Sequence, residues 1–232
     1  MGRKKLSPSN RRTPHTILTD HDLSETQVYI TYQSYDRSAH HYAATWEDDP
    51  VTIAEIKKYN INPFLKFTKP GQNLLLVNCQ TGRDYELLTK AGYVCLGTDS
   101  SYGLLTEAIS RVPTGLFLHS DPRELPFLPN SFDGVYANAL SHVPKRDIKD
   151  TLRDFRIFLR PGGILYLALK VGKKGILQLS EASGDKYYTL YTKKEIDDLI
   201  SITGFKPIWS ATSPHTDTSL PGWYSLIAKK SQ

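Results

Sequence analysis

Residues 74–84, which read Leu-Leu-Leu-Val-Asn-Cys-Gln-Thr-Gly-Arg-Asp, decide the fold of this chain of 232 residues. The continuous apolar run from Leu74 to Val77 is typical of a strand that is buried on both faces. The polar turn after it contains one glycine, Gly82, and leads into a segment with helical character at residues 84–90. A buried strand that turns directly into a helix is the opening unit of a doubly wound α/β sheet.

The same alternation of strands and helices continues along the chain. We predict further strands at residues 93–98, 116–119, 132–138, 164–169, 206–211 and 223–229. We predict helices at residues 32–46, 51–58, 84–90, 102–112, 146–159 and 192–203. Thr192 is suited to cap the last of these, because Glu195 follows three residues on. Strands that alternate with helices indicate βαβ units and a mostly parallel sheet, here in one domain over residues 26–232.

The composition limits the classes of protein to consider. Hydrophobic residues make up 39% of the chain and aromatic residues 11%, which is typical of a soluble globular protein. No apolar run approaches the ~18 residues that a membrane span needs. Cys79 and Cys95 are the only cysteines, and their spacing fits neither a disulfide framework nor a metal site. We therefore expect no metal, no membrane partner and a reducing, cytoplasmic setting, while the oligomeric state stays open.

Positive charge gathers in the first 25 residues, which show no periodicity and are predicted to form a disordered tail. Five basic side chains precede the first acid, Asp20, and the rest of the chain has 24 basic and 24 acidic residues. The five are Arg3, Lys4, Lys5, Arg11 and Arg12. Residues 1–15 are therefore a possible nucleic-acid contact through counterion release. A merely solvated terminus is the simpler interpretation, and the neutral body argues against a long nucleic acid as the main partner.

Candidate ligand-binding residues follow the ends of the predicted parallel strands. In a doubly wound sheet, ligands bind at the carboxyl ends of the strands where the strand order reverses, so the turn after Val77 is the first candidate. Asp99 ends the next strand, and a carboxylate there suits two ribose hydroxyls because it can accept both hydrogen bonds. The residues after the second, third and fourth strands are Ser100, Asp121, Pro122, Asn138, Ala139 and His142.

Several segments resemble the class I methyltransferases that use S-adenosylmethionine. Residues 121–135, DPRELPFLPNSFDGV, look like the adenine-side loop and fourth strand of that family. Residues 152–163, LRDFRIFLRPGG, are similar to its following helix and turn. Residues 187–192 and the helix after them match the branch that acts on small molecules, and residues 35–42 resemble the N-terminal helix that closes over the cofactor. The resemblance covers residues 32–230 in unbroken order.

The resemblance implies a Rossmann-like doubly wound fold, with a mostly parallel seven-stranded sheet, helices on both faces and a late antiparallel strand. It implies S-adenosyl-L-methionine as cofactor and methyl transfer to an unidentified small-molecule or other modest acceptor. The implied cofactor-binding residues are Asn78, Cys79, Gln80, Gly82, Asp99, Ser100, Asp121, Pro122, Asn138 and Ala139. The implied acceptor-binding residues are Tyr35, Tyr42, His142 and Tyr188. His142 is also the candidate general base, although a lone histidine before Val-Pro is more often structural.

The cofactor loop departs from the family pattern, which has an acid two residues before the loop and then Gly-x-Gly-x-Gly. This chain has Leu76 for the acid, Asn78 and Gln80 for the first two glycines, and keeps only Gly82. Asn tolerates a left-handed backbone, whereas the Gln80 amide either fills cofactor space or donates a hydrogen bond to the methionine carboxylate. Three hypotheses therefore stay open: a methyltransferase, a catalytically degenerate binding or scaffold protein of the same fold, and an RNA methyltransferase aided by the basic tail.

Overall fold

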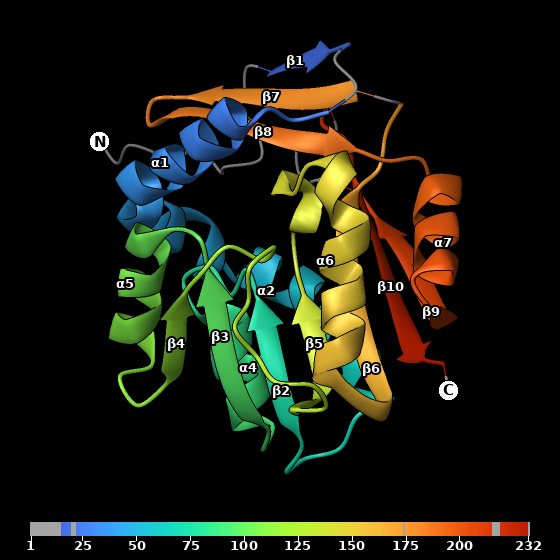
Figure 1. Cartoon of the computed structure of the whole chain (residues 1–232). Coiled ribbons are helices and arrows are strands. Elements are labelled where there is room, and N and C mark those ends of the chain that lie inside the picture. Colours follow the sequence, from blue (N-terminus) through green and yellow to red (C-terminus); the bar gives the residue numbers. More distant parts are fainter. Residues whose placement is uncertain (1–14, 20–21, 174, 215–218, 232) are drawn as a thin grey trace.

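The computed structural model describes residues 15–19, 22–173, 175–214 and 219–231, which form two sheets with helices around them (Figure 1). The strands are β1 (His15–Leu18), β2 (Asn73–Val77), β3 (Val94–Asp99), β4 (Leu116–His119), β5 (Phe132–Ala137), β6 (Leu159–Lys170), β7 (Gly175–Glu181), β8 (Gly184–Leu190), β9 (Phe205–Ser213) and β10 (Trp223–Lys230). The helices are α1 (Glu25–Tyr42), α2 (Pro50–Ile56), α3 (Asn62–Leu65), α4 (Arg83–Lys90), α5 (Tyr102–Arg111), α6 (Lys145–Phe158) and α7 (Lys193–Ile202). There are also three short helical turns: η2 (Ala43–Glu47), η3 (Lys57–Ile61) and η4 (Leu140–His142).

The large sheet has seven strands in the order β4-β3-β2-β5-β6-β10-β9. β2 is parallel to both β3 and β5, and only β10 runs antiparallel to its neighbours, β6 and β9. The prediction of a mostly parallel sheet with a late antiparallel strand is therefore confirmed. The strand order reverses between β2 and β5, so the carboxyl ends of these two strands form the crevice in which ligands of doubly wound sheets bind.

The two faces of this sheet build separate cores, because alternate side chains of a strand point to opposite faces. Leu75 and Val77 pack with α6 and α7 on one face. Leu74 and Leu76 pack with α3, α4 and α5 on the other. Leu76 is fully buried there, so the position where the family pattern has an acid is part of the apolar core.

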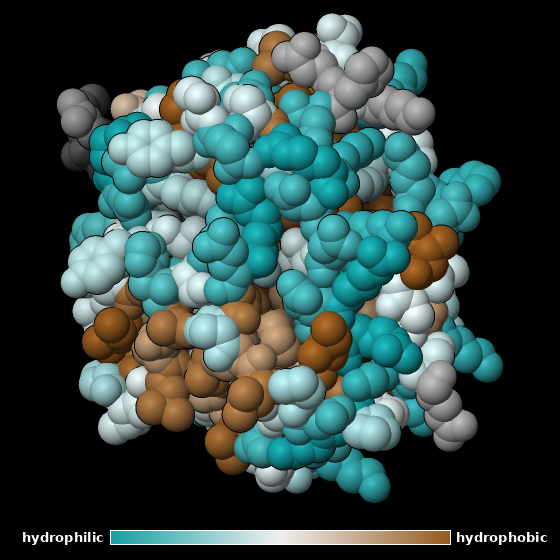
Figure 2. Space-filling view, viewed as in Figure 1, coloured by the Kyte–Doolittle hydropathy of each residue, from teal (hydrophilic) through white to brown (hydrophobic). Residues whose placement is uncertain are grey.

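One part of the sheet surface has no helix over it. The connection from β4 to β5, residues 120–131, crosses this face as an irregular loop. Val94 on β3 and Leu116 on β4 are 55% and 61% exposed, and Figure 2 shows an apolar surface over this region. It lies toward the amino ends of the parallel strands and away from the crevice at their carboxyl ends.

A second, three-stranded sheet in the order β1-β7-β8 is the main feature that the sequence did not predict. Residues 15–18, which we expected in the tail, pair with β7 as strand β1, from His15↔Leu179 to Leu18↔Ile176. Helix α1 begins earlier than predicted, at Glu25, because Ser24 and Gln27 form a capping box. Residues 1–14 of the predicted basic tail lie outside the described residues.

This small sheet and α1 form a cap over the carboxyl ends of the parallel strands (Figure 1). The Tyr187 N–H on β8 donates a hydrogen bond of 3.0 Å to the Thr31 hydroxyl on α1, which joins the two parts of the cap. Among the described residues, no helix is both long and apolar enough to cross a membrane. The cap closes the crevice between β2 and β5 into a cavity, and the functional residues lie around it.

Candidate functional site

The loop after β2 keeps a left-handed backbone at three alternate positions. The φ angles are 55° at Asn78, 53° at Gln80 and 82° at Gly82. These are the positions at which the family pattern has glycine, and a left-handed backbone costs a residue with a side chain roughly 1–2 kcal/mol. Ala139, on the facing turn after β5, also has a positive φ of 51°. The glycines are replaced, but the backbone path that glycine usually provides is retained.

The Asp99 carboxylate at the end of β3 holds this path in place. Its Oδ2 accepts a hydrogen bond of 2.9 Å from the Gln80 N–H, and its Oδ1 accepts one of 2.9 Å from the Ser101 N–H. Asp99 is only 4% exposed. The carboxylate thus joins the end of β3 to the loop and to the start of α5. The predicted ribose acid is therefore also the residue that fixes the loop.

Asn78 brings an unpaired acceptor to the loop. Its Nδ2 donates to the Ala139 carbonyl over 3.3 Å, which fixes the orientation of the amide. Its Oδ1 is buried and has no hydrogen-bond partner in the described part of the chain. An unsatisfied buried acceptor costs about 1–3 kcal/mol, so it marks a place where a ligand N–H would be stabilised.

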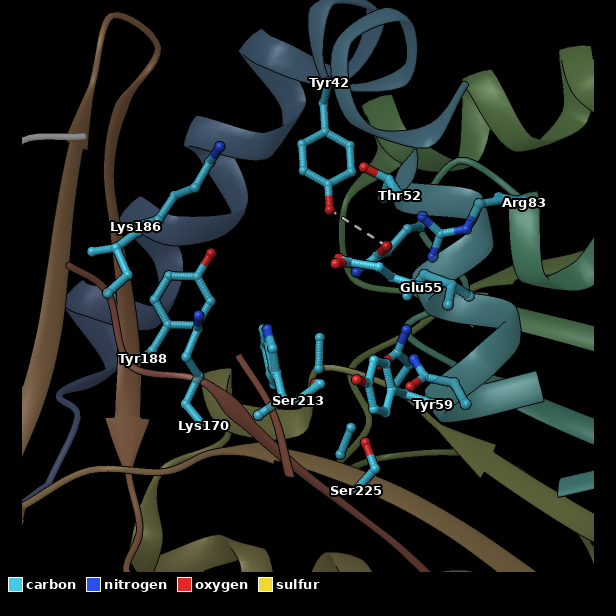
Figure 3. A pocket seen from close by; sticks show the side chains of 18 of the residues that line it. Tyr42, Thr52, Glu55, Tyr59, Arg83, Lys170, Lys186, Tyr188, Ser213 and Ser225 are labelled. Carbon is cyan, nitrogen blue, oxygen red and sulfur yellow. Dashed lines mark hydrogen bonds between the residues drawn. The ribbon is translucent and has the colours of Figure 1, made fainter. Parts of the chain in front are cut away.

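The cavity under the cap has a volume of about 210 Å³. Gln80 of the loop lines it, and the Tyr42 hydroxyl donates to the Gln80 Oε1 over 3.5 Å. Figure 3 shows Lys170, Lys186 and Tyr188 on one side and Tyr42, Thr52, Glu55, Tyr59 and Arg83 on the other. Asn138, Ala139, Tyr35 and Trp223 also line it. The structure thus brings six predicted residues to one cavity: Tyr35, Tyr42, Gln80, Asn138, Ala139 and Tyr188.

A buried polar network positions two of the lining residues. The Arg83 Nε donates to the Asp84 Oδ1 over 2.8 Å. The other carboxylate oxygen of Asp84 accepts from the Tyr136 hydroxyl over 3.1 Å and from the Asn138 Nδ2 over 3.2 Å. Burial, with the Asp84 charge next in importance, raises the pKa of Tyr136 well above its ordinary value, so this hydroxyl stays a donor. The network fixes the Arg83 guanidinium and the Asn138 amide at the cavity wall.

His142 lies behind the cavity wall rather than on it. Its Nδ1 lies 2.7 Å from the Tyr187 carbonyl, so Nδ1 carries the proton and Nε2 is the acceptor. The Tyr35 hydroxyl lies 3.2 Å from this Nε2 and 2.9 Å from the Tyr188 hydroxyl. Burial lowers the pKa of His142 to about 4, which keeps the imidazole neutral. The predicted base therefore reaches the cavity only through two tyrosine hydroxyls.

The predicted adenosine-side residues lie under α1, outside the cavity. The Tyr32 hydroxyl of α1 lies beside Ser100, with the carboxylates of Asp99 and Asp121 nearby. Asp121 forms a two-point ion pair with Arg123, with distances of 3.0 Å from Nε to Oδ1 and 2.8 Å from Nη2 to Oδ2. Pro122 is buried between the paired residues. No pattern in the sequence indicated this pairing.

Cys79 and Gly82 belong to the loop but serve its packing. The Cys79 N–H donates to the Thr98 carbonyl over 2.9 Å, which ties the loop to β3. A side chain at Gly82 would approach Ala108 of α5 to 3.1 Å, in addition to meeting the left-handed backbone. These two residues shape the loop without lining the cavity.

Two buried lysines of the cavity were not predicted. Lys170, at the end of β6, is 1% exposed, and burial lowers its pKa to about 7. Lys186 on β8 is paired with Glu181 at 2.6 Å. Lys170 directly follows the apolar run of residues 164–169, and a lysine at the carboxyl end of a parallel strand was the signal that could have identified it. Lys186 had no such signal, because the hairpin that contains it was not predicted.

The fold defines the class of protein. The structure of 1,6-didemethyltoxoflavin-N1-methyltransferase from Burkholderia thailandensis, solved with S-adenosylhomocysteine, superposes with a TM-score of 0.71 at 16% identity, over 94% of this chain and 96% of that one. A DhpI complex with SAH gives a TM-score of 0.70 at 15% identity, over 90% and 99% of the two chains. At these identities the likeness shows a common fold, that of Rossmann-like methyltransferases.

Sequence comparison points to the same class of protein. A family model described as a methyltransferase domain matches residues 75–163, which run from β2 through the start of β6. A demethylmenaquinone methyltransferase of Renibacterium salmoninarum is 32% identical over 127 residues, and the methyltransferase GfsG of Streptomyces halstedii is 28% identical over 177. These alignments cover 53% and 65% of this chain and only 48% and 63% of the relatives. In fold and in sequence, the chain is thus similar to the class I S-adenosylmethionine-dependent methyltransferases, the family that its sequence was predicted to resemble.

Proposed function

We propose that the protein transfers a methyl group from S-adenosyl-L-methionine to a small-molecule acceptor held in the cavity under the cap. The observation that carries this proposal is the left-handed loop of residues 78–82. It has the backbone of a cofactor loop without its first two glycines, and it places an unpaired buried acceptor, the Asn78 Oδ1, at the end of β2. A loop that had lost its ligand would have no need for either feature, because both are destabilising.

The residues present fit the methionine end of the cofactor. The Asn78 Oδ1 would accept a hydrogen bond from the methionine ammonium, in place of the acid that Leu76 replaces. The Arg83 guanidinium and the Gln80 amide at the cavity wall would bind the carboxylate. A bound cofactor supplies a methyl group on a positively charged sulfur, which is already a strong electrophile. The protein then has mainly to align donor and acceptor and to exclude water.

The adenosine end would lie between β3 and α1. The Asp99 carboxylate would accept hydrogen bonds from the ribose hydroxyls, and Ser100 follows it in the chain. Asp121 and Pro122 are on the adenine side, where the Arg123 ion pair holds the Asp121 carboxylate. The cap has to move relative to these residues for the cofactor to enter, because Tyr32 lies beside Ser100. We therefore assign α1 as a lid as well as a wall.

The acceptor site would be formed by the tyrosines of the cap. Tyr35, Tyr42 and Tyr188 line the cavity, and its volume of about 210 Å³ suits a small molecule. We assign His142 as a positioning residue, because it touches the cavity only through the hydroxyls of Tyr35 and Tyr188. Its neutral Nε2 accepts from Tyr35 and so orients the chain of hydroxyls that faces the acceptor.

Calorimetry with S-adenosylmethionine and S-adenosylhomocysteine tests this proposal. We expect both to bind, and we expect Asn78→Gly to weaken both by about tenfold or more, because a hydrogen bond to a charged group contributes about 1.5–3 kcal/mol. Asn130→Gly is the matched control, since Asn130 also has a positive φ, of 58°, but lies in the connection from β4 to β5, where its N–H donates to the Ile157 carbonyl over 2.9 Å. Absence of heat with folded protein at millimolar ligand would refute the proposed activity.

A degenerate, non-catalytic binding or scaffold protein is the second candidate. The Asp121–Arg123 ion pair and the position of Tyr32 favour it, because both occupy the adenosine side. In that case the cavity would bind a small molecule, while the calorimetric titrations with S-adenosylmethionine and S-adenosylhomocysteine would show no heat of binding.

The RNA methyltransferase hypothesis rests on residues 1–15, nearly all of which lie outside the described residues. Its test is deletion of those residues, which should lower RNA affinity and flatten its salt dependence. An unchanged salt slope would remove the tail from consideration.

A further inference from the structure

Lys170 differs from the other cationic side chains of the cavity. Arg83 is paired with Asp84 at 2.8 Å, and Lys186 with Glu181 at 2.6 Å. Lys170 is as deeply buried as either, yet no carboxylate of the described residues forms an ion pair with it, and desolvation alone accounts for its lowered pKa. A buried cation without a counter-charge is costly unless a ligand supplies that charge.

The polar contacts of the Lys170 amine are incomplete. Its Nζ donates to the Pro221 carbonyl over 3.1 Å. A lysine amine offers up to three donors, so the group has unused capacity for a ligand. Figure 3 shows the Lys170 side chain running along the Tyr188 ring on the cavity wall. An anionic or hydrogen-bonding ligand atom in the cavity would therefore be a natural partner.

The walls around this amine are aromatic. The Trp223 ring centroid lies 4.4 Å from the Lys170 Nζ, and the Tyr188 ring centroid lies 5.4 Å from it. Tyr42 and Tyr59 lie across the cavity from Tyr188 (Figure 3). Flat π surfaces favour a planar, conjugated molecule, which can stack against them while its polar atom reaches the amine.

We propose that the methyl acceptor is a planar conjugated molecule with an acidic hydroxyl group, a phenol or an enol, and that Lys170 binds its oxygen as the anion. This inference rests on the proposed methyltransferase function and names the acceptor class of the same cavity. On binding, the O–H bond of the acceptor breaks and an N–H bond forms at the neutral Lys170 Nζ. The electron pair stays on the oxygen and spreads over the conjugated ring.

The other charged groups around the cavity make Lys170 the place for this anion. Lys186 is neutralised by Glu181 on the cap, and Arg83 is paired with Asp84 and is the proposed partner of the methionine carboxylate. Glu55 of α2 lines the opposite side and would repel an oxyanion there. His142 adds no charge, since burial lowers its pKa to about 4. The anionic oxygen is therefore directed toward the β6 end of the cavity.

Absorbance with 4-nitrophenol as probe tests the inference, because the phenolate absorbs at a longer wavelength than the phenol. The titration is made about one pH unit below the pKa of the free phenol, with and without S-adenosylhomocysteine. We expect the wild-type protein to bind the probe as phenolate and to bind 4-nitroanisole, which has no acidic proton, at least tenfold more weakly. Equal affinity for the two probes would overturn the inference.

Three variants separate charge, proton transfer and folding. Lys170→Met should abolish the phenolate signal. Lys170→Arg should also bind the probe as phenolate, because its fixed positive charge stabilises the anion, but the proton of the phenol should then be released to the solvent, since arginine keeps its own proton. Lys145→Met is the control, since Lys145 also lies over a tyrosine ring, at 4.8 Å from the Tyr191 centroid, but away from the cavity. It should keep the wild-type signal, and circular dichroism should show all three variants to be folded.

The outcomes also separate this inference from the proposed function. If S-adenosylhomocysteine binds and Lys170→Met retains the full phenolate signal, the acceptor class is wrong while the methyltransferase proposal stands. If S-adenosylhomocysteine does not bind but the phenolate signal appears and depends on Lys170, the cavity site is supported and the methyl-transfer function fails.

Discussion

Replacing Lys170 by methionine should make the protein more stable at neutral pH while removing its proposed acceptor site. Burial lowers the pKa of Lys170 from 10.5 to about 7. The unfolded chain therefore binds this proton up to a pH near 10.5, whereas the folded chain loses it near pH 7. Stability rises with pH wherever the unfolded state binds more protons, so this lysine imposes its full penalty below pH 7 and progressively less above it.

The size of the effect follows from the pKa difference. Each pKa unit corresponds to about 1.4 kcal/mol, so the desolvated lysine costs on the order of 4–5 kcal/mol below pH 7. The substitution loses the hydrogen bond to Pro221, which leaves a carbonyl unsatisfied at a cost of about 1–3 kcal/mol. It also loses the cation–π contact with Trp223, which contributes about 1–2 kcal/mol. Methionine has a similar length and leaves little empty space. A net gain of roughly 1–2 kcal/mol is expected at pH 7.

Urea denaturation of both proteins from pH 6 to pH 9.5 measures this difference. We expect the advantage of Lys170→Met to be constant below pH 7 and then to shrink by up to about 1.4 kcal/mol per pH unit. His142 is present in both proteins, but the Lys170 charge is one cause of its lowered pKa, so the slope is compared above about pH 7.5, where this imidazole is neutral in the folded and the unfolded chain. A less stable variant at pH 7, or a difference that does not change with pH, would show that Lys170 is not an uncompensated buried amine.

Three further predictions test other parts of the structure. Wild-type stability should fall from pH 6.5 toward pH 4, because His142 is protonated in the unfolded chain over this range, whereas burial keeps its imidazole neutral in the folded protein down to about pH 4. His142→Gln should flatten that part of the stability curve in urea titrations. Gln80→Gly should raise stability by about 0.5–1 kcal/mol in thermal melts by relieving a left-handed backbone, and a lower melting temperature would contradict the strain assigned to the loop. Gly103→Ala should loosen the lid, because its Cβ would lie 2.7 Å from the Asp36 carbonyl oxygen of α1, and limited proteolysis within α1 should become faster with the parallel sheet still protected.

The large sheet was predictable because its strands carry strong local signals. β2 and β6 are nearly continuous apolar runs, and each predicted strand of this sheet corresponds to an observed one with ends displaced by a few residues. The largest displacement is in β6, which begins at Leu159 and includes the Pro-Gly-Gly segment that we expected to form a turn. Local patterns identify buried parallel strands well, because both of their faces must be apolar.

The small sheet was not predictable in the same way. β1 has four residues and an exposed burial pattern, so its stability depends on pairing with β7, far away in the sequence. β8 combines Asp185 and Lys186 with tyrosines, a composition that shows no clear alternation until its partners are known. The N-terminal segment therefore looked like part of the charged tail.

The candidate site shows the same division between local and long-range information. The position of the cofactor loop followed from the strand and helix around it. Asp121, the acidic residue expected to bind adenine, forms an ion pair with Arg123, which also contacts Glu25 and Asp147 from two distant helices. No local sequence pattern predicts such a network, because the tertiary structure determines which charged residues lie next to each other.

The distribution of unfavourable features bears on whether this fold still binds ligands. Left-handed φ angles at Gln80 and Ala139, the unpaired Asn78 Oδ1 and the uncompensated Lys170 all lie in or beside one cavity. Each of them lowers stability, and each could be removed by a single substitution. A scaffold that no longer bound a ligand would be free to accumulate such substitutions, since single substitutions that raise the stability of a protein are easy to find. Their persistence together around the crevice between β2 and β5 is best explained by ligands that pair with these groups, which favours the enzyme over the degenerate protein.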